Sequence, residues 1–164
     1  MSKFNELVGR VIKWSEGIDL YNQSTESKQV SKAFEEFAEL IAAIDDKNEY
    51  EIKDAIGDIL VCLVNAKHLE GGLEIYKNCF DSTRKCGLEI LSDVAADMAY
   101  GDYNSSLGGL EQLCIELNFD IEECFEMAVD TIEKRKLLMV NGKAVKWENM
   151  TEEQRDIWRS RNEI

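Results

Sequence analysis

The chain has 164 residues and a formal net charge of −14, with 45% hydrophobic and 32% charged residues. This composition indicates one globular domain with a sizeable core, and it excludes a disordered chain. The large negative charge argues against a broad nucleic-acid-binding surface. No stretch approaches the roughly 18 apolar residues that span a bilayer. Residues 1–10 also lack the apolar run of a signal peptide, so we expect a cytoplasmic protein without membrane association.

Helical periodicity runs through most of the sequence, and proline, which breaks helix interiors, is absent. A Ser24 or Thr25 cap is expected for the second of the predicted helices. The helices are expected over residues 2–20, about 26–44, 49–69, 87–100, 107–117 and 121–136. Residues 73–86 show no clear pattern.

The C-terminal part has a different pattern. Asn141 and Gly142 between two short apolar runs predict a two-residue β-hairpin, and residues 151–161 predict a short exposed helix. We therefore predict a single all-α domain over residues 1–164, a four-helix-type bundle with a small C-terminal hairpin. Its core is expected over about residues 2–136, with the hairpin and tail over 137–164.

Carboxylates lie along the edges of apolar stripes on two consecutive predicted helices. The stripe of the first consists of Val30, Ala33, Phe34, Phe37, Ile41 and Ile44. Glu36 and Glu39 lie one turn apart beside it. The stripe of the second helix consists of Ile52, Ile56, Ile59, Leu63 and Ala66, and one flank carries Glu51, Asp54, Asp58 and Asn65.

If these two helices pack antiparallel through their stripes, their acidic flanks meet over a shared groove. The carboxylates there would repel one another unless a cation lies between them. Oxygen ligands without histidine or cysteine suit a hard divalent ion, Mg²⁺ or Mn²⁺. The alternative is an ordinary solvated acidic face. The metal site is favoured over it, because two such clusters occur on consecutive helices.

These residues carry a family resemblance. The run Gln29, Lys32, Glu35, Glu36, Glu39 and Leu40, followed by Gly57 and Asp58, resembles the MazG-like all-α nucleoside triphosphate pyrophosphohydrolases. The resemblance is strongest over residues 28–68. Residues 120–136, followed by Met139–Gly142, are also similar to the C-terminal portion of bacteriophage-type members.

The resemblance implies Mg²⁺-dependent conversion of a nucleoside triphosphate and water to a nucleoside monophosphate and pyrophosphate. The family pattern is Glu-x-x-Glu on one helix, matched by Glu36 and Glu39, and Glu-x-x-Asp on the next, closed here by Asp58. Ala55 departs from the pattern, because the family usually has Glu at this position. Asp54 is the expected substitute as a metal ligand, with Glu51 as an alternative.

Further roles follow from this interpretation. Glu35 or Glu51 is expected to act as the general base. Lys32 is expected to contact substrate phosphate, although an ion pair with Glu36 explains it equally well. Asn65 lies on the flank of Asp58, within reach of a phosphate, a sugar or a metal-bound water.

Two regions outside the acidic helices are weaker candidates for substrate binding. Trp14 is a candidate for stacking on the base, but a core position is favoured. Lys134, Arg135 and Lys136 are candidates for binding phosphate from a neighbouring subunit, but cations at a helix end are favourable anyway. The resemblance further implies a homodimer or a dimer of dimers. The rival hypothesis is a catalytically impaired, acidic helical interaction protein of the same fold.

Overall fold

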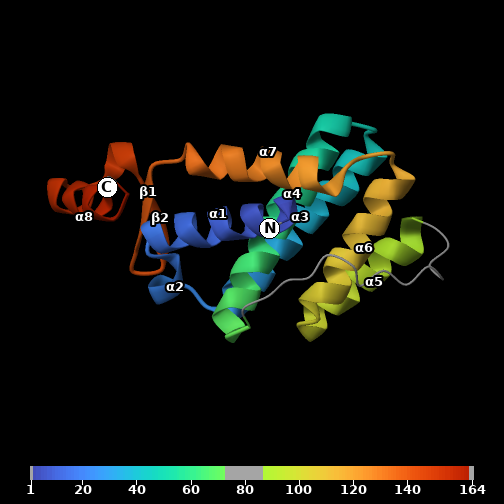
Figure 1. Cartoon of the computed structure of the whole chain (residues 1–164), viewed down its shortest axis with the longest axis horizontal. Coiled ribbons are helices and arrows are strands. Elements are labelled where there is room, and N and C mark those ends of the chain that lie inside the picture. Colours follow the sequence, from blue (N-terminus) through green and yellow to red (C-terminus); the bar gives the residue numbers. More distant parts are fainter. Residues whose placement is uncertain (1, 73–86, 163–164) are drawn as a thin grey trace.

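The computed structural model describes residues 2–72 and 87–162. These residues form helices joined by short turns and one two-stranded hairpin, which confirms the all-α prediction (Figure 1). None of the described helices is long and apolar enough to cross a membrane. Residues 73–86, which show no clear sequence pattern, lie outside the described residues. The elements are α1 (Lys3–Gly17), α2 (Leu20–Gln23), α3 (Glu26–Asp45), α4 (Glu49–Glu70), α5 (Gly87–Tyr100), α6 (Tyr103–Glu116), α7 (Ile121–Glu133), β1 (Leu137–Val140), β2 (Lys143–Lys146), a 3-10 turn (Trp147–Asn149) and α8 (Glu152–Asn162).

Helices α3 and α4 form an antiparallel pair whose bounds agree with the predictions to within a residue. Thr25 caps α3 by accepting a hydrogen bond from the Lys28 backbone N–H at 3.3 Å. Asn48 caps α4 in the same way, accepting from the Glu51 N–H at 3.3 Å. Gly71 ends α4 in the left-handed conformation with φ 92°, where glycine carries no steric penalty.

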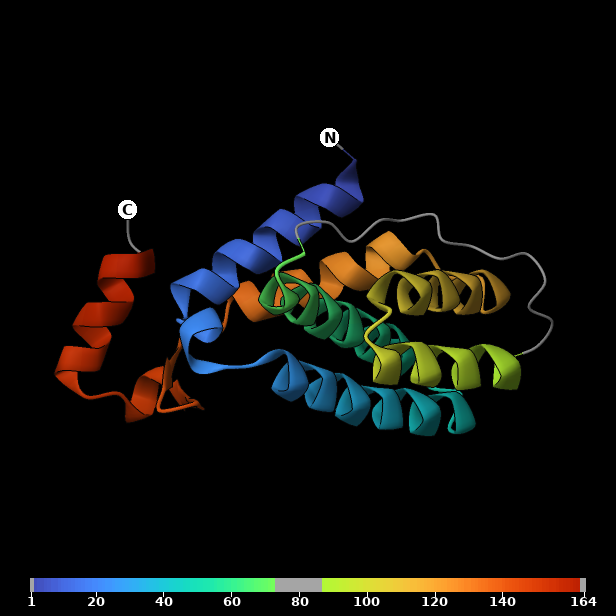
Figure 2. The ribbon, with the colours of Figure 1, turned by 90° about the horizontal axis from the view of Figure 1, so that it is seen from below.

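Helix α4 is the central helix of the bundle. From Ala55 to Ala66 every residue except Asp58 is buried, so the predicted amphipathic stripe is too narrow for this helix. The reason is that α1, α3, α6 and α7 all pack against α4 (Figure 2). Gly57 permits the close approach of α7, because a Cβ there would lie 2.4 Å from the Cys124 carbonyl oxygen and 2.7 Å from the Ala128 Cβ.

The buried face of α3 is rotated relative to the predicted stripe. Ile41, assigned to the stripe, is 47% exposed, whereas Leu40 is completely buried. Both residues are apolar, so periodicity alone does not choose between two neighbouring faces. The rotation moves Glu36 from the stripe's edge into the packed face, where it is 7% exposed.

Helices α5 and α6 pack against each other at one end of the molecule, and α7 returns along α4 (Figure 1). Helix α5 has the predicted bounds. Helix α6 begins at Tyr103, earlier than the predicted Leu107, because Asp102 caps it by accepting from the Ser105 N–H at 3.1 Å. Helix α7 begins after the predicted cap Asp120 but ends at Glu133, before the predicted residue 136.

The predicted hairpin is confirmed. Its two central residues, Asn141 and Gly142, have positive φ values of 51° and 75°. Positive φ at both central positions is typical of a type I′ turn, whose twist matches that of the flanking strands in a two-residue hairpin. The antiparallel register of β1 and β2 places Leu137 opposite Lys146.

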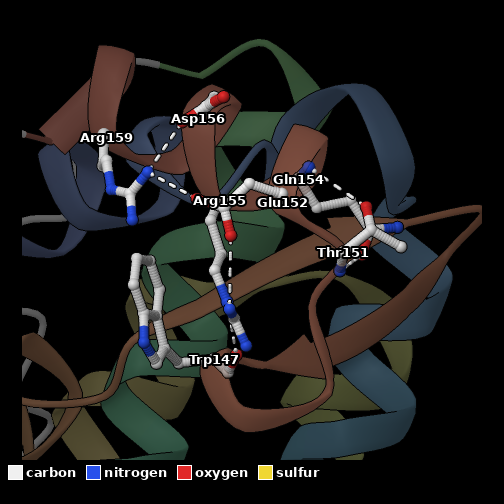
Figure 3. A network of polar contacts seen from close by, with 7 residues as sticks. All are labelled: Trp147, Thr151, Glu152, Gln154, Arg155, Asp156 and Arg159. Atoms are coloured by element: carbon white, nitrogen blue, oxygen red, sulfur yellow. Dashed lines mark hydrogen bonds and ion pairs between the residues drawn. The ribbon is translucent and has the colours of Figure 1, made fainter.

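Helix α8 packs against the hairpin. The prediction of an exposed helix over residues 151–161 is therefore wrong for the face of α8 that contacts the hairpin. Thr151 and Gln154 form a reciprocal capping box, with the Gln154 N–H donating to Thr151 Oγ1 at 3.3 Å and the Thr151 N–H to Gln154 Oε1 at 2.9 Å (Figure 3). Trp158 is 9% exposed and shares a small second core with Leu138 and Met150.

The last helix also contacts the first two. The helix predicted over residues 2–20 is interrupted at Asp19, which has φ 68° and separates α1 from α2. The Asn162 side chain donates to the Gly17 carbonyl at 3.0 Å, and Arg161 forms an ion pair with Asp19 at 2.6 Å. Helix α8 is therefore attached to the α1–α2 junction.

Candidate functional site

Lys32 and Glu36 form an ion pair at the edge of the α3–α4 interface. Lys32 Nζ lies 2.7 Å from Glu36 Oε1 and 3.0 Å from Glu35 Oε2. The hydrogen bond to Glu36, followed by the one to Glu35, raises the pKa of Lys32 above its usual value against the effect of burial. Lys32 is therefore a permanent cation that neutralises a buried carboxylate. The predicted ion pair is confirmed, and the phosphate contact of Lys32 stays a prediction.

Asp58 lies half-buried on α4, in electrostatic reach of the buried Glu36. Burial, then the charges of Glu36 and Asp54, raises the pKa of Asp58 to about 6, although the charges of Arg135 and Lys32 act in the opposite direction. The charges of Glu36 on α3 and of Asp54 on α4, two further predicted ligands, thus act on Asp58 across and along the α3–α4 pair. We call Glu36, Asp54 and Asp58 the carboxylate cluster.

Ala55, the residue that departs from the Glu-x-x-Asp pattern, is buried in the structure. Ala55 is 4% exposed and packs in the main core. Asp54 is partly exposed, and its charge raises the pKa of Asp58. Glu51 lies exposed in the first turn of α4. Of the two predicted substitutes, Asp54 is therefore the one whose charge acts on Asp58.

The carboxylate cluster suits a hard cation in its chemistry. Its donors are all oxygen, and after burial the charges of Glu36 and Asp54 are the next causes that raise the pKa of Asp58. Within residues 2–72 and 87–162, however, no three acidic, histidine or cysteine side chains are grouped closely enough to hold a metal ion. Glu39 is exposed on α3. Metal binding therefore stays a prediction that needs these side chains to converge.

Asn65 and Trp14 make contacts that stabilise the bundle. Asn65 is 1% exposed, and its Oδ1 accepts hydrogen bonds from Ser15 Oγ and Tyr21 Oη, each at 2.8 Å. These bonds join α1, the α2 residue Tyr21 and α4. Trp14 packs against the main core, as its helical spacing favours. The substrate contacts expected of both residues stay predictions.

Lys134 and Arg135 line a pocket of about 680 Å³ between the end of α7 and the hairpin. Lys136, Lys146 and Trp147 line the same pocket, and of these Lys146 and Trp147 were not among the predicted site residues. One signal for Lys146 was present in the sequence. A two-residue turn at Asn141 and Gly142 fixes the strand register and places Lys146 beside the end of α7.

No family model matches the chain, and no solved structure matches it. The chain is similar to an uncharacterized 18.2 kDa protein from the rep–hol intergenic region of Haemophilus phage HP1, with 34% identity over 77 residues. The match covers 45% of this chain and 47% of the phage protein, about half of each, and the relative's name states no activity.

Proposed function

We propose that this chain is a Mg²⁺-dependent nucleoside triphosphate pyrophosphohydrolase that releases pyrophosphate from NTP or dNTP. The observation that carries the proposal is the pKa of Asp58, raised to about 6 beside the buried Glu36. A half-buried carboxylate beside a second, buried carboxylate is a recurrent feature of functional sites, and a bound cation would relieve the repulsion between the two. The resemblance over residues 28–68 supplies the reaction class.

In this proposal Glu36, Asp54 and Asp58, together with Glu39 from the next turn of α3, hold Mg²⁺ or Mn²⁺. The ion, when bound, neutralises charge on the phosphate oxygens. Lys32 neutralises Glu36 in the ligand-free protein. We expect its ammonium group to turn to a phosphate oxygen of the substrate.

The attacking water needs a carboxylate to orient it and accept its proton. Glu35 and Glu51 are the two candidates, and both are exposed near the carboxylate-bearing faces of their helices. Glu35 is already paired with Lys32, so a turn of Lys32 toward substrate would release it. Glu35→Gln and Glu51→Gln therefore separate the candidates, because only the variant of the base should lose turnover while keeping metal binding.

A second candidate function is that of an acidic helical interaction protein without catalysis. The observation favouring it is that the cluster side chains of the described residues do not converge on one point, in a chain with a net charge of −14. Metal-dependent stabilisation separates the two candidates. A metal site raises the unfolding midpoint at low Mg²⁺ or Mn²⁺ concentration, whereas an acidic surface responds only as it does to NaCl of equal ionic strength.

The direct test is pyrophosphate release with Mg²⁺ across a panel of nucleoside triphosphates and diphosphates. We expect release from at least one triphosphate, and a loss of about a hundredfold or more in Asp58→Asn. Asp46→Asn is the matched control, since Asp46 is an exposed aspartate in the α3–α4 turn. Turnover of Asp58→Asn equal to that of Asp46→Asn would remove Asp58 from the site. An expected homodimer is tested on the same samples by sedimentation.

A further inference from the structure

The pocket between α7 and the hairpin gathers positive charge in an acidic protein. Of the residues that the structure describes, four cations line it, Lys134, Arg135, Lys136 and Lys146, against one carboxylate, Glu148. The net charge of the whole chain is −14. The volume of the pocket, about 680 Å³, is within the range of small-ligand sites. We call it the basic pocket.

These four cations differ from most others of the described residues in having no carboxylate partner. In residues 2–72 and 87–162, none of the four forms an ion pair within 4.0 Å. By contrast, seven cations elsewhere do form ion pairs: Lys3, Arg10, Lys32, Lys67, Arg155, Arg159 and Arg161. A cleft lined by unneutralised charge of one sign concentrates ions of the opposite sign. The basic pocket is therefore suited to an anion.

Trp147 forms a fixed wall of the basic pocket. Arg155 and Arg159 lie over its ring at 5.5 and 5.4 Å, and Lys136 Nζ lies 5.2 Å from the same ring centroid. Arg155 and Arg159 are themselves paired with Glu152, as Figure 3 shows for Arg159 beside Trp147. Arg159 also pairs with Asp156 at 2.7 Å, so these two guanidinium groups have two carboxylate partners, which leaves the pocket lysines and Arg135 for a ligand.

We propose that the basic pocket binds the phosphate groups of a small polyphosphate, which is the nucleoside triphosphate itself if the proposed function holds. Lysine and arginine are the side chains that bind phosphate by charge and by hydrogen bonding. A short ligand fits the charge distribution better than a nucleic acid, because a long polyanion would also meet the surrounding acidic surface. The charge of Arg135 also acts on the carboxylate cluster, where it lowers the pKa of Asp58 against the effect of burial.

The test is calorimetric titration of inorganic tripolyphosphate into the protein with EDTA present, so that the carboxylate cluster does not contribute through a metal. Lys146→Ala is the test variant and Lys143→Ala the matched control. Both lysines are exposed on β2, and only Lys146 lines the basic pocket. We expect saturable binding that weakens about tenfold in Lys146→Ala, and further with Lys134→Ala added, but not in Lys143→Ala.

Two results would overturn the proposal. One is the absence of saturable binding at low salt, and the other is equal affinity of Lys146→Ala and Lys143→Ala. Circular dichroism of both variants verifies the fold. Failure of the proposed function would give a different result. Tripolyphosphate would bind with an affinity that depends on Lys146, yet no nucleoside triphosphate would be hydrolysed. Asp58→Asn should retain tripolyphosphate binding, which separates the pocket from the carboxylate cluster.

Discussion

The carboxylate cluster and the basic pocket carry charges of opposite sign, and the fold positions them differently. Glu36 and Asp58 lie at the packed interface of α3 with the central helix α4. Lys134 and Lys146 lie exposed at the end of α7 and on a two-stranded hairpin. In both places like charges gather without full neutralisation. Charge in the bundle should therefore alter stability, whereas charge at the hairpin should alter only ligand binding.

The largest expected effect is at Gly57, which tests how tightly α4 is enclosed. A methyl group there would lie 2.4 Å from the Cys124 carbonyl oxygen, so α7 must move away. We expect Gly57→Ala to lower the free energy of unfolding by about 3 kcal/mol in urea titrations. Gly9→Ala is the control, because nothing lies within 4 Å of its added Cβ. It should stabilise the helix by about 0.5–1 kcal/mol. Equal effects of Gly57→Ala and Gly9→Ala on stability would mean that α7 does not pack closely against α4 at Gly57.

A smaller effect is expected at Asn65, which tests whether the polar group on α4 is structural. Asn65→Leu leaves the Ser15 and Tyr21 hydroxyl groups without their acceptor. We expect a loss of about 2 kcal/mol, against about 1 kcal/mol for Tyr21→Phe, which removes one donor only. Should Asn65→Leu unfold like the parent but fail to bind nucleotide, the substrate contact predicted from the sequence would be right instead.

The smallest of these effects has the opposite sign and concerns Asp58. A carboxyl group whose pKa is raised to about 6 holds its proton more tightly in the folded protein. Its contribution to stability is present below about pH 4 and is lost as the pH rises through 6. In EDTA at pH 7, Asp58→Asn should therefore be more stable than the parent by about 1–2 kcal/mol, a value reduced for partial exposure. Thermal unfolding between pH 4 and 8 measures this, with Asp46→Asn as control. A parent profile identical to that of Asp58→Asn would contradict it.

Local signals in the sequence predicted most of the helices and the hairpin. Thr25 and Asn141–Gly142 act through neighbours in the chain, so their effect is visible without the fold. The choice between Leu40 and Ile41 as the buried residue was not visible, because it depends on which helices surround α3. The enclosure of α4 likewise depends on partners far away in the sequence.

The candidate site divides in the same way. The positions of Glu36 and Asp58 relative to the apolar residues of their own helices are visible in the sequence, and the packing of α3 on α4 lets the charge of Glu36 act on Asp58. The contacts of Asn65 with Ser15 and Tyr21 join residues from three different helices, which periodicity does not predict. The basic pocket could not be predicted from the sequence, because it depends on where α7 ends. The helix ends at Glu133, and Lys134–Lys136 therefore lie beside the hairpin.

The attachment of α8 to the α1–α2 junction has a consequence for how the protein responds to acid. Burial alone would raise the pKa of Asp19, but hydrogen bonds from Arg161 and Asn22 outweigh it and leave this pKa below its usual value. A lowered pKa contributes stability that is lost as the pH falls, which is the reverse of Asp58. Protonation thus relieves repulsion between Glu36 and Asp58 while it weakens the Arg161–Asp19 ion pair, which leaves the Asn162 hydrogen bond to Gly17 as the contact that does not depend on Asp19. Acid unfolding of this protein should accordingly begin at its C-terminal helix and reach the central bundle last.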